Sequence, residues 1–244
     1  MKIIPLSEGS FTIDKSKLFV PFDESEDDLG ERAKGSLLVE VQPFLVVTTE
    51  DVLLLDTGLG FEKDGVLQLH KNIMDAGINP SEITKVLMTH LHKDHAGGVT
   101  YLKDGKSTIS FPNATYYIQR KELEYAFTKG MPSYIPDELN ELRNASNVEL
   151  LDGDGVISGY IKYELSGGHC PFHQVFTIVD AGETVFFGGD EAPQLHQLKR
   201  RFAAKYDYDG KRAMELRQQW YEQATEHHWK MLFYHDIKHA CVAL

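Results

Sequence analysis

The sequence predicts an α/β or α+β fold in which helices cover layers of β-sheet, and three observations support this class. Short runs rich in β-branched and aromatic residues end at Gly, Asp or Asn, as strands often do. Longer segments with apolar residues at helical spacing lie between several of these runs. The chain has 244 residues, enough for a large core, and we treat residues 1–244 as a single domain.

Polar residues follow the expected strands at the point where each strand ends. The expected strands are Leu37–Val47, Val52–Leu55, Val86–Met88, Val175–Val179, Val185–Phe187 and Met231–Tyr234. Asp56, His90, Asp190 and His235 each lie at the carboxyl end of such a strand or just beyond it. Side chains at strand ends can converge at one edge of the sheets, where ligand sites of layered α/β folds tend to lie.

Three segments have the apolar spacing of helices. They are Asp64–Ala76, Pro136–Ala145 and Gly210–His228. Gly77 is a plausible stop for the first of these helices. The acidic stretch Asp23–Glu31 has few apolar residues, and we expect it to be a solvated loop.

Composition narrows the class of partner. The formal net charge of −12 argues against nucleic acid or an anionic membrane as the main partner, because both require clustered Lys and Arg. Two cysteines are too few for a disulfide scaffold. No stretch approaches the ~20 apolar residues that span a bilayer, and Met1–Lys17 lacks the apolar run of a signal peptide. We expect a cytoplasmic monomer or homodimer that acts on a small molecule.

Four potential metal ligands lie within six residues, directly after a buried strand: His90, His92, Asp94 and His95. Imidazole and carboxylate groups suit zinc and other borderline divalent ions. The first two histidines are two residues apart, so an extended backbone would point both to the same side. Asp94 and His95 follow as the chain turns and can face a different point. One ion cannot easily bind all four, so the segment indicates two ions.

The two residues after this segment, Gly97 and Gly98, are expected to allow a tight turn. Chance clustering is the competing interpretation, because the chain contains 11 histidines. Four ligand-type residues in six, directly after a strand, favour metal binding over chance.

At this point the sequence resembles the metallo-β-lactamase superfamily of hydrolases. The run His90-Leu91-His92-Lys93-Asp94-His95 matches its His-x-His-x-Asp-His signature. Four further landmarks occur along the chain in the order that the family requires. They are Asp56-Thr57-Gly58, Gly168-His169-Cys170-Pro171-Phe172-His173, Gly188-Gly189-Asp190 and His235-Asp236. The second landmark matches the family's Gly-His-Thr-Pro-Gly-His imperfectly. The resemblance covers nearly the whole chain and implies a four-layer αββα sandwich.

The resemblance also implies that the chain binds two divalent metal ions and indicates which residues are their ligands. The ions are expected to be zinc, with iron or manganese as alternatives. The resemblance assigns His90, His92 and His169 to the first ion, and Asp94, His95 and His235 to the second. Asp190 and a hydroxide would bridge the two ions, and Asp94 and Asp190 would be the catalytic carboxylates. The chemistry agrees, because a divalent ion lowers the pKa of bound water from ~16 towards ~7.

Three neighbouring residues receive other expected roles. Asp56 would orient a ligand imidazole, although it can equally end a strand and form a turn. His173 is expected to be structural or to support a ligand. Cys170 adjoins His169, but the aligned family position is usually Thr, and we expect a small packed residue.

The branch that fits best resembles the acyl-homoserine-lactone lactonases and the related organophosphate-hydrolase-like proteins. Tyr206-Asp207-Tyr208-Asp209, followed by Ala213 and Arg217, resembles their Asp-rich turn and their helix with an inward-facing Arg. A helix that only covers a sheet is an equal alternative. The lactonases carry a Tyr three residues after the bridging Asp, where this chain has Pro193. Tyr206, Tyr208 and His196 lie in the right region to replace it.

These observations predict a hydrolase of a small ester or lactone that uses a metal-bridging hydroxide. A phosphotriester or thioester hydrolase on the same site is the alternative. A di-iron redox protein is less favoured, because such relatives usually carry a flavodoxin-like domain after this one. A non-catalytic binding module is also less favoured, because none of the seven ligands is missing. Phe22, Phe61 and the loop Asp23–Gly35 are candidates to line the substrate pocket, because loops at strand ends usually do, and an acidic loop that is only solvated is the alternative.

Overall fold

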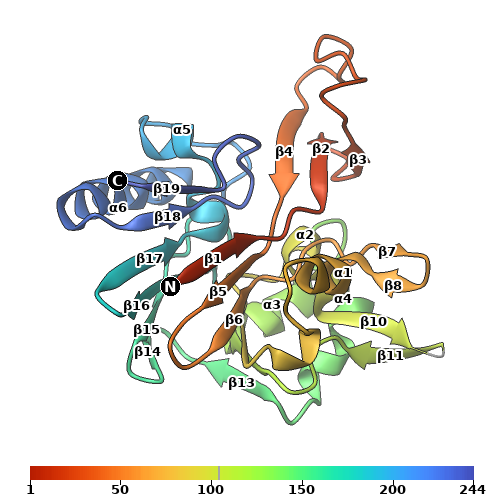
Figure 1. Cartoon of the computed structure of the whole chain (residues 1–244). Helices are drawn as coiled ribbons and strands as arrows, with labels where there is room; N and C mark the ends of the chain where they lie inside the picture. The colour runs from red at the N-terminus through yellow and green to blue at the C-terminus, as the bar shows by residue number, and fades with distance from the viewer. Residues whose placement is uncertain (104) are drawn as a thin grey trace.

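Two six-stranded sheets dominate the computed structural model, which describes residues 1–103 and 105–244 (Figure 1). The first sheet has the order β1 (Lys2–Pro5), β5 (Phe44–Val47), β6 (Val52–Leu55), β9 (Lys85–Leu87), β12 (Thr115–Gln119) and β13 (Val148–Leu151). The second has the order β14 (Gly155–Ile157), β15 (Ile161–Leu165), β16 (Gln174–Asp180), β17 (Glu183–Phe187), β18 (Lys230–Leu232) and β19 (Cys241–Ala243). Strands β6, β9, β12 and β13 pair in parallel, as do β17 and β18, so their carboxyl ends reach one edge.

Three smaller sheets accompany the main pair. Strands β3 (Phe19–Pro21), β2 (Gly9–Ile13) and β4 (Leu37–Val41) form a three-stranded sheet, which we call the wing. The wing projects beyond the sandwich in Figure 1. The two hairpins pair β7 (Glu62–Lys63) with β8 (Val66–Leu67), and β10 (Thr100–Lys103) with β11 (Lys106–Ile109).

Helices lie outside both main sheets. The α-helices are α1 (Gln68–Asp75), α2 (Lys93–Ala96), α3 (Arg120–Lys129), α4 (Pro136–Leu139), α5 (Leu195–Leu198) and α6 (Gly210–His227). The short 3₁₀ helices are η1 (Pro80–Glu82), η2 (Gly97–Val99), η3 (Asn140–Arg143) and η4 (Gly189–Glu191). No helix among the described residues combines the length and apolar character needed to cross a membrane.

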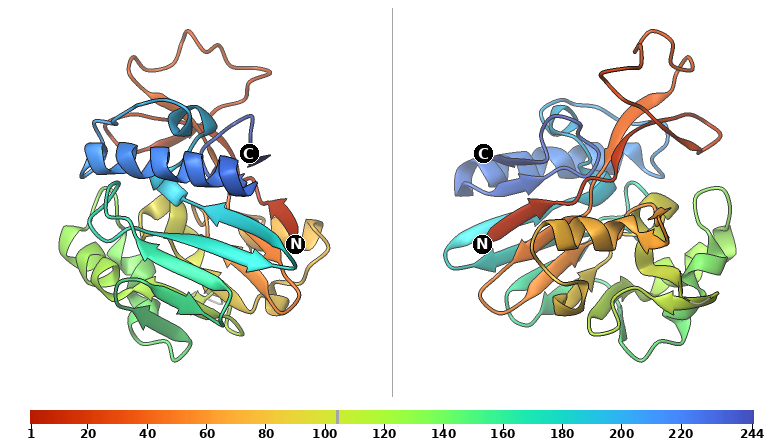
Figure 2. Two further views of the ribbon diagram at one scale, coloured as in Figure 1. Left: turned by 90° about the vertical axis from the view of Figure 1, so that its left-hand side faces the viewer. Right: turned by 45° about the vertical axis from the view of Figure 1, so that its right-hand side comes forward.

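Alternation along the strands produces the layers. In β6, Leu54 faces the core beneath α1 and α3, whereas Leu53 and Leu55 face the second sheet. In β17, Phe187 faces the first sheet, and Phe186 packs against Trp220 of α6. The layers are therefore helix, sheet, sheet and helix, and Figure 2 shows α6 across the outer face of the second sheet. The expected α/β sandwich is confirmed.

The element boundaries correct the sequence expectations in three places. Leu37–Val47 is two strands, β4 and β5, because Gln42 and Pro43 carry the chain from the wing into the first sheet. The helix expected over Asp64–Ala76 begins only at Gln68, since the preceding residues form the β7–β8 hairpin. Pro136–Ala145 is one α-helical turn, α4, followed by η3.

The remaining expected elements are confirmed. The strand expectations at Val52–Leu55, Val86–Met88, Val175–Val179, Val185–Phe187 and Met231–Tyr234 correspond to β6, β9, β16, β17 and β18. The helix expected over Gly210–His228 is α6, which stops where His228 takes a left-handed conformation. Helix α3 was not expected, because one position on its buried face is occupied by Glu122.

Gly97 and Gly98 are glycines because another loop approaches them closely. The expected tight turn is present as η2, but the backbone dihedral φ of Gly97 is −60° and neither glycine has a positive φ, so the turn does not itself require glycine. A Cβ on Gly97 would overlap the carbonyl of Leu59, and one on Gly98 would overlap that of Thr57. The Thr57 N–H and hydroxyl donate to the carbonyl of His95 at 2.7 and 2.9 Å. The loops after β6 and β9 are therefore docked directly on each other.

A buried carboxyl group supports the loop after β6. Glu8 is 7% exposed, and one of its oxygens accepts a hydrogen bond from the N–H of Leu59 at 2.7 Å. The other oxygen has no hydrogen-bond partner among the described residues. Burial raises the pKa of Glu8 to about 7, so the folded protein binds this proton more tightly than the unfolded chain does.

We expect Glu8→Gln to flatten the pH dependence of stability. Because the pKa of Glu8 rises from 4.5 to about 7 on folding, its contribution to stability is fully present below pH 4.5 and is lost as the pH rises through 7. The loss is on the order of 3 kcal/mol. The free energy of unfolding of both proteins, measured from pH 4.5 to 8.5, should shift in favour of the variant as the pH rises. A constant difference across this range would contradict the prediction.

Candidate metal centre

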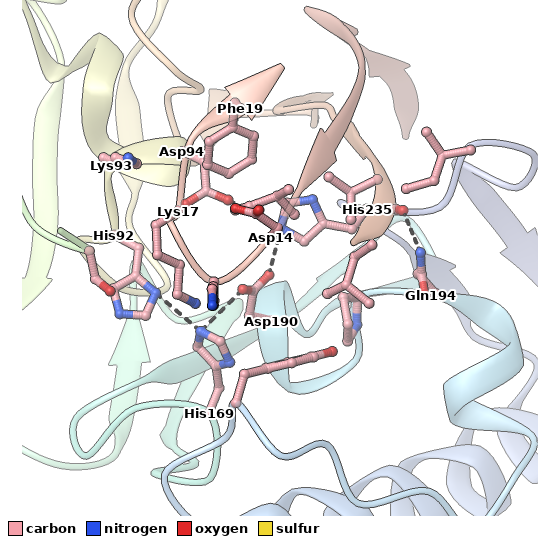
Figure 3. Close-up of a pocket in the computed structure, with 18 of the residues that line it drawn as sticks. Asp14, Lys17, Phe19, His92, Lys93, Asp94, His169, Asp190, Gln194 and His235 are labelled. Atoms are coloured by element: carbon pink, nitrogen blue, oxygen red, sulfur yellow. Dashed lines mark hydrogen bonds and ion pairs between the residues drawn. The ribbon is translucent and has the colours of Figure 1, made fainter. Parts of the chain in front are cut away.

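Four strands of the two sheets deliver polar residues to one edge of the sandwich. Asp56 follows β6, His90 follows β9, Asp190 lies in η4 after β17, and His235 follows β18. Figure 3 shows the labelled side chains of His92, Asp94, His169, Asp190 and His235 turned towards one another at this edge. The convergence expected from the strand ends is present in the fold.

The structure gathers the seven predicted ligands into two groups of donor atoms. One donor atom from each member of a group lies within 4.8 Å of the others. The groups are His90, His92, His169 and Asp190, and Asp94, His95 and His235. The four clustered residues of the first motif divide between the groups in pairs, because α2 begins between the pairs, at Lys93. Their role as ligands stays a prediction.

The carboxylate of Asp190 lies between the two groups. Its Oδ1 is 3.1 Å from Nε2 of His95 and 3.0 Å from Nε2 of His235. Its Oδ2 is 3.1 Å from Nε2 of His169 and 4.0 Å from Nε2 of His90. Each oxygen thus faces one group, an arrangement suited to a bridging ligand.

Hydrogen bonds from the outer ring nitrogens to a carboxylate or carbonyl oxygen orient three of the imidazoles. The Nδ1 of His95 lies 2.8 Å from Asp56 Oδ2, that of His169 lies 3.0 Å from Asp207 Oδ1, and that of His235 lies 2.6 Å from the Glu40 carbonyl oxygen. Carboxylate and carbonyl oxygens only accept, so each Nδ1 donates and each inward Nε2 is left to face the centre. Metal-binding histidines are typically held in this way.

His90 is held by a longer relay. The hydroxyl of Thr89 donates to Asp56 Oδ2 at 2.7 Å, so it can accept from Nδ1 of His90, 3.0 Å away. Asp56 also accepts from the N–H of Thr89 at 2.7 Å. Asp56 therefore orients an imidazole as expected, and its backbone φ of 56° also places it in a turn.

The inward-facing atoms need a positive charge between them. Nε2 of His90 is buried without a hydrogen-bond partner among the described residues. Nε2 of His95 and Nε2 of His235 approach to 3.4 Å, and Nδ1 of His92 and Nε2 of His169 approach to 3.1 Å. Facing nitrogen lone pairs repel unless a proton or a metal ion lies between them. The donor set, five imidazoles and two carboxylates, fits two divalent ions such as zinc.

The pKa shifts of these residues also indicate that the site favours positive charge at its centre. Burial lowers the pKa of His92 to about 3, so this ring stays neutral and free to act as a ligand. Burial opposes the charged form of His235, but Asp190 and Asp94 outweigh it and raise the pKa to about 9. Burial likewise opposes ionisation of Asp94, yet His95 and His235 bring its pKa to about 2. The negative charges of Asp94 and Asp190 favour the protonated form of His235, and a bound metal ion can supply the same positive charge.

His173 and Cys170 support the centre from outside the two groups. The N–H of Asp190 donates to Nε2 of His173 at 3.2 Å, and the other ring nitrogen lies 2.8 Å from the Ser166 hydroxyl. His173 is therefore a supporting residue, as expected. Cys170 is 4% exposed, lies 3.6 Å from Glu122, and belongs to neither donor group. Its expectation as a packed residue is confirmed.

Three buried charged residues surround His169, and of these the sequence analysis missed Glu191 and named Asp207 only as part of an Asp-rich turn. One oxygen of Glu191 accepts from the N–H groups of Gly168 and His169 at 2.5 and 2.9 Å. Asp207 holds the ring of His169. Arg217 is 1% exposed, so its expected inward orientation is confirmed, and it donates to the carbonyls of Glu191 and Phe202. The Asp-rich turn was the available signal, but it did not indicate which carboxylate would reach the histidine.

A cavity of about 740 Å³ opens onto the centre. Its apolar wall comes mainly from the wing, through Ile13, Phe19, Leu37, Leu38 and Val39. Of the candidates Phe22, Phe61 and Asp23–Gly35, only Gly35 lines it, and the acidic residues Asp23–Glu31 are exposed, as in the alternative of a solvated loop. The strands of the wing, rather than the acidic loop at its tip, face the cavity.

Pro193 and Tyr206 both line this cavity, whereas Tyr208 and His196 do not. The carbonyl of Pro193 accepts from the N–H of His235 at 3.0 Å, so this residue positions a predicted ligand through its backbone. The hydroxyl of Tyr206 accepts from the amide of Gln197 at 3.4 Å, which leaves its own proton free to donate. Partial burial raises the pKa of Tyr206 to about 12, so the hydroxyl keeps its proton at neutral pH.

We expect Asp207→Asn to weaken metal binding by roughly 10- to 100-fold, because loss of a carboxylate behind a ligand imidazole typically has this effect. Competition with a chromogenic zinc chelator measures the affinity without reference to activity. Asp152→Asn is the matched control, since Asp152 pairs with Arg120 at an exposed site. Equal zinc affinities for the two variants would contradict the role of Asp207.

With the geometry established, comparison with known proteins identifies the family. The metallo-beta-lactamase superfamily matches residues 39–234. The N-acyl homoserine lactonase AttM of Azorhizobium caulinodans is 34% identical over 113 residues, which cover 42% of this chain and 38% of that protein. The chain thus spans less than two fifths of the length of this relative.

Solved structures share the fold. A probable metal-dependent hydrolase from Staphylococcus aureus has a TM-score of 0.79 at 22% identity and covers 99% of this chain and 91% of its own. AidC, a dizinc quorum-quenching lactonase in complex with a product, has a TM-score of 0.73 at 22% identity, with coverages of 98% and 88%. At these identities the likeness concerns the fold alone. Because the family match extends over most of its length, this chain belongs to the metallo-β-lactamase superfamily.

Proposed function

We propose that the protein is a dinuclear metal-dependent hydrolase of a small carboxylic ester or lactone. The observation that carries this proposal is the position of Asp190, with one oxygen towards each of two groups of donor atoms. The superfamily fold implies divalent metal ions. The number of ions and their identity as zinc are part of the proposal.

The residues would divide as the sequence predicted. His90, His92 and His169 would hold one ion, Asp94, His95 and His235 the other, and Asp190 both. When bound, two such ions supply a hydroxide nucleophile at neutral pH and polarise a substrate carbonyl. Asp94 and Asp190 would act as the catalytic carboxylates, keeping their negative charge beside the reacting atoms.

The substrate class is inferred from the cavity and the relatives. A cavity volume of about 740 Å³ accommodates a small organic molecule, and the apolar wall of the wing suits an acyl chain. The sequence relative is an N-acyl homoserine lactonase, and the structural relative AidC is a dizinc lactonase. We carry lactone or ester hydrolysis from these proteins to this chain as a proposal. A phosphotriester or thioester would need the same donor atoms and remains the alternative substrate.

Tyr206 is our proposed replacement for the lactonase tyrosine that Pro193 displaces. It lines the cavity, its ring centroid lies 6.1 Å from that of His169, and its hydroxyl proton is free to be donated. A donor aimed at the substrate carbonyl stabilises the negative charge that develops there.

We expect the purified protein to bind two metal ions per chain. We also expect a chelator that removes these ions to abolish its hydrolytic activity. Elemental analysis measures the metals, and a panel of lactones, aryl esters, thioesters and phosphotriesters measures the substrate class. Asp94→Asn should lower kcat by at least about 100-fold, more than loss of a supporting hydrogen bond usually costs. Asp152→Asn serves again as the exposed control. Full activity of Asp94→Asn, or of metal-free protein, would rule out the mechanism.

Tyr206→Phe should lower kcat by about 100-fold with little change in KM or metal content, because its hydrogen bond acts mainly in the transition state. Tyr208→Phe is the matched control, since Tyr208 is 70% exposed and does not line the cavity. Steady-state kinetics on the best lactone or ester compares the two variants. Equal kcat values in Tyr206→Phe and Tyr208→Phe would assign the carbonyl contact to another group.

A further inference from the structure

Lysines outnumber the carboxylates among the residues that line the cavity, whereas acidic residues outnumber basic ones in the whole chain. The sequence carries 37 acidic and 25 basic residues. The lysines that line the cavity are Lys15, Lys17, Lys93 and Lys205. The lining carboxylates are Asp14, Asp94 and Asp190, and the last two belong to the candidate metal centre. Away from the metals, the cavity wall is therefore cationic.

Lys17 reaches into the cavity from the turn that joins β2 and β3. The turn is held by Asp14, whose carboxylate accepts from the N–H and hydroxyl of Ser16 at 2.8 and 2.5 Å. The backbone φ of Lys17 is 61°, and its N–H donates to the carbonyl of Asp14 at 3.0 Å. Figure 3 shows the Lys17 side chain extending towards His92, His169 and Asp190.

Lys205 lines the same cavity from a different part of the chain, the segment between α5 and α6. Neither Lys17 nor Lys205 takes part in an ion pair within 4.0 Å in the part of the chain that the structure describes. The other two cations have neighbours, since Lys15 adjoins the carboxylate of Asp14 and Lys93 lies 5.9 Å from the centroid of the Phe19 ring.

Two cations without carboxylate partners favour an anion in the cavity. Asp94 and Asp190 do not compensate them, because two bound divalent ions would exceed the charge of these carboxylates. Ile13, Phe19 and Leu38 form an apolar wall beside the lysines. A neutral acyl chain would use only this wall, whereas an amphipathic molecule with an anionic group would use both surfaces.

We propose that the substrate carries an anionic group, a carboxylate or a phosphate, in addition to its ester or lactone, and that Lys17 and Lys205 bind this group. The inference rests on the proposed function, because it places the reacting carbonyl at the metal centre. It narrows the substrate class from neutral acyl lactones to anionic esters or lactones.

Binding of product analogues to the zinc-loaded protein tests this proposal without requiring turnover. Isothermal titration calorimetry compares acids of equal length: succinate with butyrate, glutarate with valerate, and adipate with hexanoate. We expect at least one dicarboxylate to bind about tenfold more tightly, or ~1.4 kcal/mol, than its partner. The preference should weaken with added salt. 3-Phosphonopropionate, compared with succinate, shows whether a phosphate or a carboxylate is preferred.

Variants connect the preference to the two lysines. Lys17→Met combined with Lys205→Met keeps the aliphatic stems and should reduce the preference to less than threefold, with monocarboxylate binding unchanged. Lys121→Met combined with Lys129→Met is the matched control, because both lysines lie on α3 and do not line the cavity. Thermal unfolding of both double variants checks that the fold is retained.

The outcomes separate this inference from the proposed function. Equal affinities within every pair, or a preference that survives the Lys17 and Lys205 substitutions, would overturn the anionic subsite. Hydrolysis is measured separately with p-nitrophenyl hexanoate and the mono-p-nitrophenyl ester of adipic acid. If neither is hydrolysed while the lysine-dependent preference is present, the subsite stands and ester hydrolysis is contradicted. Hydrolysis of both without a binding preference contradicts only the subsite.

Discussion

The carboxylate of Asp190 is the interaction on which the rest of the site depends. It follows a strand of the second sheet, yet its Oδ1 lies 3.1 Å from Nε2 of His95, which follows a strand of the first sheet, and 3.0 Å from Nε2 of His235, which follows a strand of the second. Such contacts are possible only if the two sheets pack with these strand ends at one edge. The packing of Phe44 against Phe187 between the sheets therefore also sets the geometry of the site.

Buried carboxyl groups behind the predicted ligands are the second constraint. Burial raises the pKa values of Glu8, Glu122 and Glu191, and each carboxyl group accepts backbone N–H groups of a loop that carries or adjoins a predicted ligand. An unpaired buried carboxylate destabilises a fold. In this protein the buried carboxyl groups also hold the loops in fixed positions through hydrogen bonds. A site whose ligands lie on several different strands requires such fixed loops.

We infer that the wing determines which substrates the cavity binds. Its strands supply the apolar wall, and its β2–β3 turn supplies Lys17. The residues of the candidate metal centre come from the loops that follow strands of the two main sheets. We infer that substrate choice depends on the wing, which also contributes Phe11, Val39 and Val41 to the core between the sheets, and proteins that share the fold can differ in such an element.

The sequence alone was enough to predict the layered α/β class, six of the twelve strands described in the two main sheets, helix α6 and the proximity of the strand-end residues. These follow from short-range periodicity and from a motif in which ligand residues are close in the sequence. It did not show helix α3, where buried Glu122 breaks the apolar pattern, or the division of Leu37–Val47 between two sheets. Only the tertiary structure decided that Asp207 supports His169, that Gly97 is required by contact with Leu59, and that Lys17 and Lys205 share a cavity. Each is a contact between segments distant in the chain, and local sequence patterns carry no information about such distances.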